Sequence, residues 1–317
     1  GRNDDIMLSM ANGYTRKFAL SYRNPFSDNK LKHGFGLEVS HSDNKEVNVL
    51  TSNNNQIFYK NPLKYIRTQT SFGGTYSYRK GSIERHYVKL QYNFDQIDDS
   101  IALLNPNFFG NGITALSYPD ISYRYQYLNV DYIPYALTGL KWDFNFLKRG
   151  FGGPLNLWQF RTRITKYWKL NSTLYFNSEA NLLVKLPFKQ PFVNQNYLGY
   201  HDNYLRGLEY SVIDGVLGAF SRNTLRKHLF DLNLNTGVKN PAYRTIPFKI
   251  FVKSFFDIGY VNNRMNAAGL GNDYQKRILY TGGVGIDILS IYDFVFRIEY
   301  GFNQFGRNGL YVHANDF

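Results

Sequence analysis

The chain has 317 residues, with 37 Lys and Arg against 24 Asp and Glu, and a formal net charge of +13. It contains no Cys, which excludes disulfides, thiolate metal sites and cysteine nucleophiles. Aromatic residues make up 18% of the chain, yet no stretch approaches the about 18 consecutive apolar residues of a membrane-spanning helix. A chain this aromatic can bury much surface, which argues against disorder. We therefore expect an all-β protein whose residues 1–317 form one domain.

Apolar and polar residues alternate with a period of two along most of the chain, the pattern of β-strands. No helix is indicated. The long connections are expected at 96–116, 187–212, 231–245 and 263–274, and the remaining turns are short. The alternation predicts about fourteen strands, at residues 4–12, 14–24, 33–50, 56–79, 82–95, 117–131, 135–148, 156–168, 170–186, 213–230, 246–262, 275–289, 291–304 and 309–316.

The length and polarity of these segments favour a membrane barrel over a soluble sandwich. Average strands have about 5–6 residues, whereas a strand that crosses a bilayer needs about 9–11. Charged residues occupy the polar face in mid-strand: Lys253 and Asp257 alternate with Phe256 and Ile258, as in a wet barrel interior. The sequence therefore predicts a transmembrane antiparallel outer-membrane β-barrel, an integral protein of the Gram-negative cell outer membrane.

Aromatic residues gather at the ends of the predicted strands. Such rings are typical of the girdle that lies at a membrane–water interface. The residues assigned to this girdle are Tyr132, Tyr135, Tyr167, Trp168, Tyr292 and Phe294.

The sequence offers no catalytic constellation, and we expect neither an enzyme nor a cofactor. The six His show no metal-ligand spacing, so no metal site is predicted. Asp95, Asp98 and Asp99 read as solvated loop charge, with a divalent-ion contact as the alternative. The basic residues are spread along the strands, which does not suit a nucleic-acid partner. They suit a lumen that passes anions or a rim that meets anionic lipid.

The connection 187–215 is the most specific segment of the chain. It is long and rich in aromatic residues, so we expect it to be packed and functional. Its Leu205-Arg206-Gly207-Leu208 stretch, followed by Glu209-Tyr210, resembles the [V/I]-R-G-[Y/F] tip of the sixth extracellular loop in the BamA/TamA family of outer-membrane assembly barrels. That family includes the two-partner secretion transporters. The expected aromatic residue is Leu208 here, and Tyr210 is predicted to take over its packing.

Three further stretches carry the resemblance. Asn24, Pro25 and Phe26 resemble an N-P-[YF] periplasmic turn early in these barrels. The stretch from Phe255 to Gly259 resembles an F-x-D-x-G strand whose inward Asp, here Asp257, pairs with the loop Arg. Residues 282–317 resemble the closing strands, with Phe317 as the C-terminal aromatic signal. The strand after the loop lacks the Glu often found there and has Thr224 to His228 instead.

The resemblance implies a barrel of about sixteen strands, within the known range, preceded by POTRA domains. It implies that those domains and two opening strands are absent from this chain. It also implies a factor that inserts or translocates proteins through a weak strand seam. The partners would be outer-membrane lipid and lipopolysaccharide, unfolded outer-membrane proteins, and periplasmic or outer-membrane accessory subunits. The alternatives are a basic-lumen porin or channel, and the membrane anchor of a larger enzyme.

Two structural predictions follow from this interpretation. Arg206 should enter the barrel and pair with Asp257. The segments 4–12 and 309–316 should be separated by a gap of about two strands, because diameter grows with strand number and the interior must hold the 187–215 loop.

Overall fold

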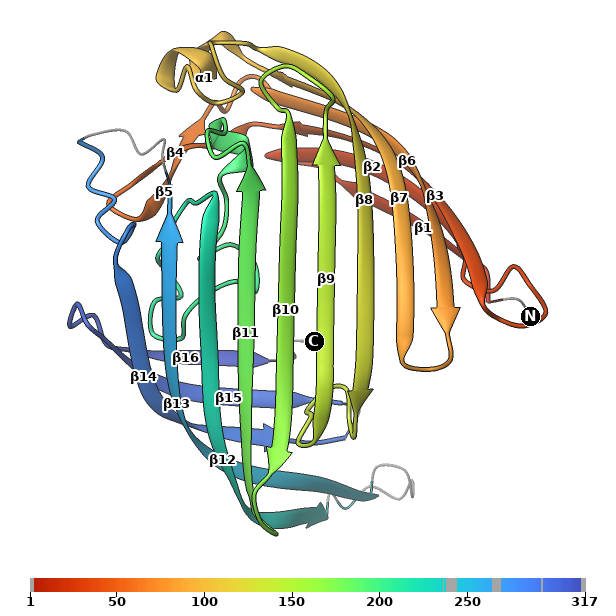
Figure 1. Cartoon of the computed structure of the whole chain (residues 1–317), viewed down its shortest axis with the longest axis vertical. Coiled ribbons are helices and arrows are strands. Elements are labelled where there is room, and N and C mark those ends of the chain that lie inside the picture. Colours follow the sequence, from red (N-terminus) through yellow and green to blue (C-terminus); the bar gives the residue numbers. More distant parts are fainter. Residues whose placement is uncertain (1–2, 236, 238–243, 264–268, 292, 315–317) are drawn as a thin grey trace.

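The computed structural model describes residues 3–235, 237, 244–263, 269–291 and 293–314. Fourteen strands form one antiparallel sheet that curves into an incomplete barrel (Figure 1). Each strand pairs with its neighbour in sequence, except that β3 pairs with β6 across an inserted hairpin. The strands of the sheet are β1 (Asp5–Ala11), β2 (Thr15–Asn24), β3 (His33–Asn44), β6 (Arg67–Lys80), β7 (Glu84–Ile97), β8 (Ala115–Val130), β9 (Gly139–Arg149), β10 (Leu157–Lys169), β11 (Leu174–Leu186), β12 (Leu217–Asn235), β13 (Thr245–Asn262), β14 (Ile278–Leu289), β15 (Val295–Asn303) and β16 (Gly309–Ala314). The predicted antiparallel barrel fold is confirmed.

The hairpin between β3 and β6 corrects two of the predicted strands. The segments 33–50 and 56–79 each divide, because the chain leaves the sheet after Asn44 and returns at Arg67. Between them, β4 (Glu46–Ser52) pairs with β5 (Asn55–Lys60) in a separate two-stranded sheet. Val47 and Val49 are buried, although β4 does not belong to the sheet that forms the barrel wall. Their alternation continues that of β3, so the period-two pattern could not reveal the break.

A short helix lies in the connection 96–116, where no helix was predicted. Asp98 caps the helix α1 (Asp99–Leu104) by accepting a hydrogen bond from the Ser100 backbone N–H. A shorter 3-10 helix, η1 (Phe192–Asn194), lies in the 187–216 loop. Ile101 packs with residues of the hairpin and of neighbouring loops in an apolar cluster at one end of the barrel: Val47, Val49, Ile66, Ile97, Phe108, Phe109, Leu155 and Phe192. Six residues are too few for a clear helical period, which is why α1 could not be predicted from the sequence.

The three carboxylates of the predicted acidic cluster have separate roles, so the interpretation as solvated loop charge was wrong for Asp95. Asp95 is 4% exposed and accepts hydrogen bonds from Nε and Nη2 of Arg67. Asp98 caps α1 and pairs with Lys64. The cause is that β7 continues to Ile97, so Asp95 occupies an inward position of the strand and not the loop. Asp99 is exposed in the first turn of α1.

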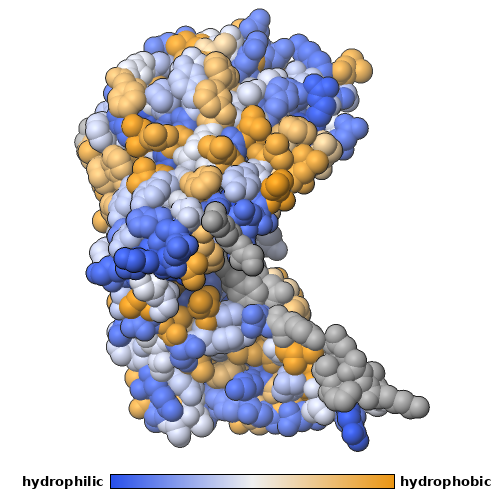
Figure 2. Space-filling view, turned by 90° about the vertical axis from the view of Figure 1, so that its right-hand side faces the viewer, coloured by the Kyte–Doolittle hydropathy of each residue, from blue (hydrophilic) through white to orange (hydrophobic). Residues whose placement is uncertain are grey.

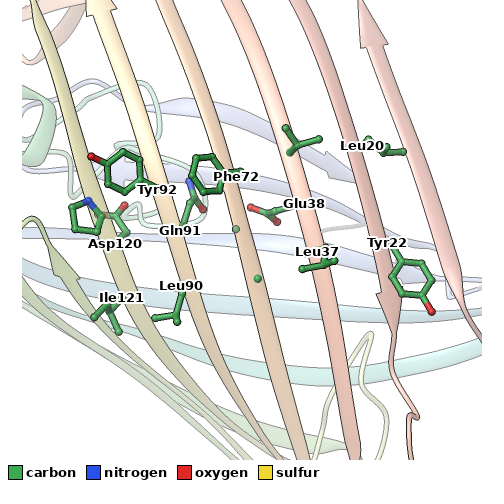
Figure 3. Close-up of a pocket in the computed structure, with 14 residues that line it drawn as sticks. Leu20, Tyr22, Leu37, Glu38, Phe72, Leu90, Gln91, Tyr92, Asp120 and Ile121 are labelled. Carbon is green, nitrogen blue, oxygen red and sulfur yellow. The ribbon is translucent and has the colours of Figure 1, made fainter.

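The sheet has an apolar outer face and a polar inner face. On β13, Phe256 and Ile258 are 51% and 39% exposed, whereas Lys253 and Asp257 are 4% and 0% exposed. On β15 too the charged residue is buried and the aromatic one is exposed, as Glu299 and Tyr300 show. Figure 3 shows this outer face over β2, β3 and β6 to β8, where Leu37, Leu90 and other apolar side chains line a depression of about 820 Å³. A soluble protein would bury such a face.

Successive connections alternate between the two ends of the sheet, as an antiparallel sheet requires. One end, the short-connection end, holds 25–32, 81–83, 131–138 and 170–173. The other end holds the long connections 45–66, 98–114 and 187–216, together with the shorter 12–14 and 150–156. The predicted loop 231–245 is shorter than expected, because β12 continues to Asn235 and β13 begins at Thr245. Among the described residues, no helix is long and apolar enough to cross a membrane.

The two ends of the sheet are not joined. No described residue of β1 pairs with one of β16, so the closing ladder that would have refuted the predicted gap is absent. Figure 1 shows β1 at the upper right, with β16 among the strands behind and below it. Figure 2 views that side, and the surface there is hollowed between the upper and lower parts of the molecule. β16 has six residues and is the shortest strand of the sheet within the described ranges.

Five of the six predicted girdle residues are among the described residues. Tyr167 precedes the exposed Trp168 on β10, lines the interior cavity and has Lys141 Nζ 5.9 Å from its ring, so its assignment was wrong. Tyr132, Trp168 and Phe294 are about 40% exposed, which suits their assignment. Tyr135 is 3% exposed and points inward, so its assignment was wrong. The cause is its hydroxyl, which donates a hydrogen bond of 2.7 Å to Asp287 in the lumen. Tyr292 lies outside the described residues.

Candidate functional site

The connection between β11 and β12, residues 187–216, folds into the barrel and packs on the inner wall (Figure 1). Tyr197, Leu198 and Leu205 of this loop are completely buried. They pack against wall residues of five elements or loops: Leu183, Phe220, Val261, Tyr274 and Leu279. The predicted packed loop is present, and its apolar side chains provide the free energy that offsets the entropy of ordering so long a connection.

Arg206 and Asp257 form a buried, two-point ion pair. Arg206 donates to Asp257 Oδ2 from Nε at 2.9 Å and to Oδ1 from Nη2 at 2.5 Å, and its backbone N–H donates to Oδ2 at 3.0 Å. Asp257 is completely buried and Arg206 is 9% exposed. The predicted contact is present, and its fork geometry fixes both the position and the orientation of the loop tip.

Two further N–H groups of the Arg206 guanidinium also donate hydrogen bonds. Nη1 donates to Thr224 Oγ1 at 2.8 Å, and Nη2 also donates to the Asn223 carbonyl at 3.2 Å. Thr224 belongs to the stretch in which the resemblance led us to expect a Glu, and its neutral hydroxyl accepts the hydrogen bond from Arg206 instead. The Phe255 ring centroid is 4.2 Å from the Arg206 Cζ, close enough for a cation–π contact.

Gly207 permits a close approach between the backbones of the loop and the wall. Its φ is +85°, and a Cβ there would lie 3.3 Å from the Phe302 carbonyl oxygen and 3.6 Å from Gly301 of β15. A side chain on Gly301 would in turn lie 2.8 Å from the Gly207 Cα. Asn303 donates a hydrogen bond of 2.8 Å to the Gly207 carbonyl. The R-G sequence therefore combines a charge anchor with a backbone-to-backbone contact.

The residues after Gly207 differ from expectation. Leu208 is 3% exposed and belongs to the apolar cluster of the loop. Tyr210 is 80% exposed, with its ring 5.7 Å from that of Tyr311. The prediction that Tyr210 takes over the packing was wrong, because Leu208 itself fills the space. Glu209 turns toward β16, where its carboxylate lies 3.2 Å from His313.

The sequence analysis missed a chain of buried charges on the wall below the loop. Lys253 pairs with Asp287 and, at 2.7 Å, with Glu299. Arg226 lies 3.6 Å from Asp287, and Tyr135 donates to the same carboxylate. Tyr135 comes from the turn 131–138, which thereby joins the first half of the sheet to the second. Each of these charges was visible as an inward position of an alternating strand, but its partners could not be identified from spacing.

Lys185 on β11 is a second residue that the sequence analysis missed. It is 2% exposed, and its ammonium donates to the carbonyls of Asn196 and Gly215 at 2.8 and 3.3 Å. These carbonyls belong to the descending and returning arms of the loop. Lys185 therefore holds both arms of the loop together.

The predicted turn at Asn24, Pro25 and Phe26 lies at the short-connection end of the sheet. The Asn24 side chain accepts a hydrogen bond from the Phe26 N–H at 3.1 Å, which shapes the turn, and Arg79 lies over the Phe26 ring. This turn and the connection 187–216 therefore lie at opposite ends of the sheet. Phe317 lies outside the described residues.

Comparisons with known proteins agree with this geometry. The structure matches the crystal structure of BamA from Haemophilus ducreyi lacking POTRA domains 1–3, with a TM-score of 0.68 at 14% sequence identity, over 99% of this chain and 64% of that chain. It matches CdiB from Escherichia coli with a TM-score of 0.56 at 12% identity, over 95% of this chain and 52% of that chain. The chain has the fold of the BamA and CdiB barrels. No family model and no curated protein matches the sequence.

The resemblance predicted from the loop motif is therefore confirmed at the level of the fold. The chain spans about 64% of the length of that BamA and about half of that CdiB. The presence of POTRA domains and of two further strands outside this chain stays a prediction.

Proposed function

We propose that this chain is the outer-membrane barrel of a factor that inserts or translocates proteins at the Gram-negative outer membrane. The observation that carries the proposal is the weak end of the sheet. Within the described part of the chain β16 has six residues, fewer than the about 9–11 that span a bilayer. Few hydrogen bonds hold such a strand to a neighbour, so it can exchange one neighbour for an incoming strand at little cost.

The outer and inner faces support a location in the outer membrane. Apolar side chains cover the outer face, and lipid together with lipopolysaccharide is the proposed surrounding. The inner face is polar, and the 187–216 loop occupies part of it. Strand exchange makes and breaks hydrogen bonds but no covalent bond, so the function needs no catalytic group. The proposed clients are unfolded outer-membrane proteins, with periplasmic or outer-membrane accessory subunits as further partners.

The loop anchored by Arg206 would hold the second half of the sheet rigid during strand exchange. Its contacts reach Asp257 on β13, Thr224 on β12 and Gly301 on β15, all within the second half of the sheet. A braced second half lets the edge strand β16 move while the wall behind it stays in register. A channel would instead require a closed, stable seam and a steady conductance.

A disulfide across the seam of the full-length protein tests the proposal. The chain has no Cys, so a Cys at Val312 on β16 and a second one in the first barrel strand of the full-length protein, on the other side of the seam, would form the only disulfide within this barrel. Oxidation should block assembly of client barrels, and reduction should restore it. The matched control is Val284→Cys with Tyr300→Cys, which are paired on β14 and β15, where locking should have no effect. Full client assembly with the seam locked would overturn the proposal, and an unchanged conductance would then favour the channel.

A further inference from the structure

Three side chains of metal-binding type meet between the loop tip and the last two strands. They are Glu209 of the loop, Glu299 of β15 and His313 of β16, and one ligand atom from each lies within 4.8 Å of the others. His313 Nε2 is 3.2 Å from Glu209 Oε2 and 3.8 Å from Glu299 Oε2. The three residues are far apart in the sequence, so no motif announces the cluster.

These separations are close to those of a zinc site. Zinc binds His nitrogen at about 2.0–2.1 Å and carboxylate oxygen at about 2.0–2.2 Å, usually as a tetrahedron. Two ligands of such a tetrahedron are about 3.3–3.5 Å apart. The two distances from His313, 3.2 and 3.8 Å, reach this geometry with shifts of a few tenths of an ångström. The ligand oxygens of Glu209 and Glu299 lie within 4.8 Å of each other and would draw together around the ion. Three protein ligands leave a fourth position for water.

The carboxylates are arranged to receive a cation. Glu299 is 3% exposed, and its Oε1 is held by Lys253 at 2.7 Å, with Arg206 at 4.0 Å, so its Oε2 is the oxygen that faces His313. The Glu209 side chain is 11% exposed, and its Oε1 is buried without a hydrogen-bond partner among the described residues. A buried carboxylate oxygen with no partner is costly, and a divalent cation bound by both oxygens of Glu209 would remove that cost.

The imidazole has a fixed direction. The His313 ring stacks on the Tyr204 ring, with centroids 6.1 Å apart and planes 14° apart. This contact keeps Nε2 directed toward both carboxylates. A zinc ligand that is held in place before binding loses less entropy on binding.

We propose that Glu209, Glu299 and His313 form a binding site for one Zn²⁺ or a similar divalent transition-metal ion. The bound ion would tie the loop tip to β16, the shortest strand of the sheet, and would hold that strand against β15. The inference goes beyond the proposed function, because metal binding is a property of this chain that is measured without any client protein.

Calorimetric titration of Zn²⁺ into the chelator-treated protein in detergent micelles tests the site. The expected result is one Zn²⁺ per chain. Loss of an outer-shell contact already lowers metal affinity about 10–100-fold, so His313→Ala and Glu209→Gln should each lower it by at least about 100-fold. The control is His228→Ala: His228 lies 2.7 Å from Asp231 but belongs to no three-ligand group among the described residues.

Titration with Co²⁺ provides a second readout, because a four-coordinate site gives intense visible absorption bands. The bands should appear in the wild type and in His228→Ala and be lost in Glu209→Gln, whose side chain keeps the shape of the original. The wild-type spectrum decides the matter even if a variant does not fold. Absence of the bands, or binding by His313→Ala as tight as that of the wild type, would overturn the proposal and indicate adventitious surface binding.

Discussion

Arg206 and Asp257 meet through two side-chain hydrogen bonds and one backbone hydrogen bond, although 51 residues separate them. The pair joins the tip of the 187–216 loop to the inner face of β13. Its energetic effect follows from burial: a lone Asp257 carboxylate would be completely enclosed without a counter-charge.

Replacing Arg206 should destabilise the protein strongly. Arg206→Ala leaves Asp257 buried and unpaired, which should lower the free energy of unfolding by about 3–5 kcal/mol. Urea unfolding in detergent measures this. The control is Arg23→Ala, which removes an exposed pair with Asp5 and should change the free energy by about 0–1 kcal/mol. An equal effect of both variants would contradict the assignment of Arg206 as the anchor.

Gly207 should tolerate no side chain. Gly207→Ala places a Cβ at positive φ and against the backbone of β15. Gly112→Ala is the matched control, because Gly112 also has positive φ but nothing within 4 Å of its Cβ position. The control should cost about 1–2 kcal/mol, and Gly207→Ala should cost at least about 1 kcal/mol more through overpacking. Thermal unfolding of both variants gives the comparison, and indistinguishable values would remove the argument for a close contact.

A charge should destabilise the protein strongly at one position of β7 and only weakly at the next. Leu90 is 57% exposed on the outer face, and Gln91 faces the lumen. Leu90→Arg should lower the free energy of unfolding from lipid vesicles by about 2–4 kcal/mol if the position lies at mid-bilayer. Gln91→Arg introduces the same group toward water and should change it much less. A smaller effect at Leu90 than at Gln91 would contradict the membrane orientation.

Asp98, in the loop that holds α1, should make a pH-dependent contribution to the free energy of unfolding. Hydrogen bonds from Lys64 and then from Ser100 lower its pKa to about 2, below the about 3.9 of an unfolded chain. A lowered folded pKa means that the stabilisation is complete above about pH 4 and is lost as the pH falls through about 2.

Two variants separate the charge of Asp98 from its capping role. Asp98→Asn keeps a capping oxygen and removes the charge, so its difference from the wild type should shrink between about pH 4 and pH 2. Asp98→Ala also removes the cap and should cost about 1 kcal/mol more at every pH. Unfolding by urea at a series of pH values tests both, and a pH-independent difference for Asp98→Asn would contradict the lowered pKa.

The sequence by itself determined the strands and their faces. Alternation at Lys253, Phe256 and Asp257 indicated which side chains enter the lumen, because a strand has a strict period of two. The same regularity hid the break after Asn44, where β4 keeps the alternation of β3 while leaving the sheet. The loop motif indicated the partner of Arg206, since one family pattern contained both residues.

Only the tertiary structure decided how the inward groups combine. Tyr135 reaches Asp287, Lys185 holds both arms of the loop, and Glu209 meets His313 because the sheet curves and the loop folds inside it. Strand alternation specifies whether a side chain points inward or outward. It does not specify the position of that side chain along the barrel axis or its neighbour across the lumen. Those depend on register, curvature and the path of the loop, which are set by packing between residues distant in the chain.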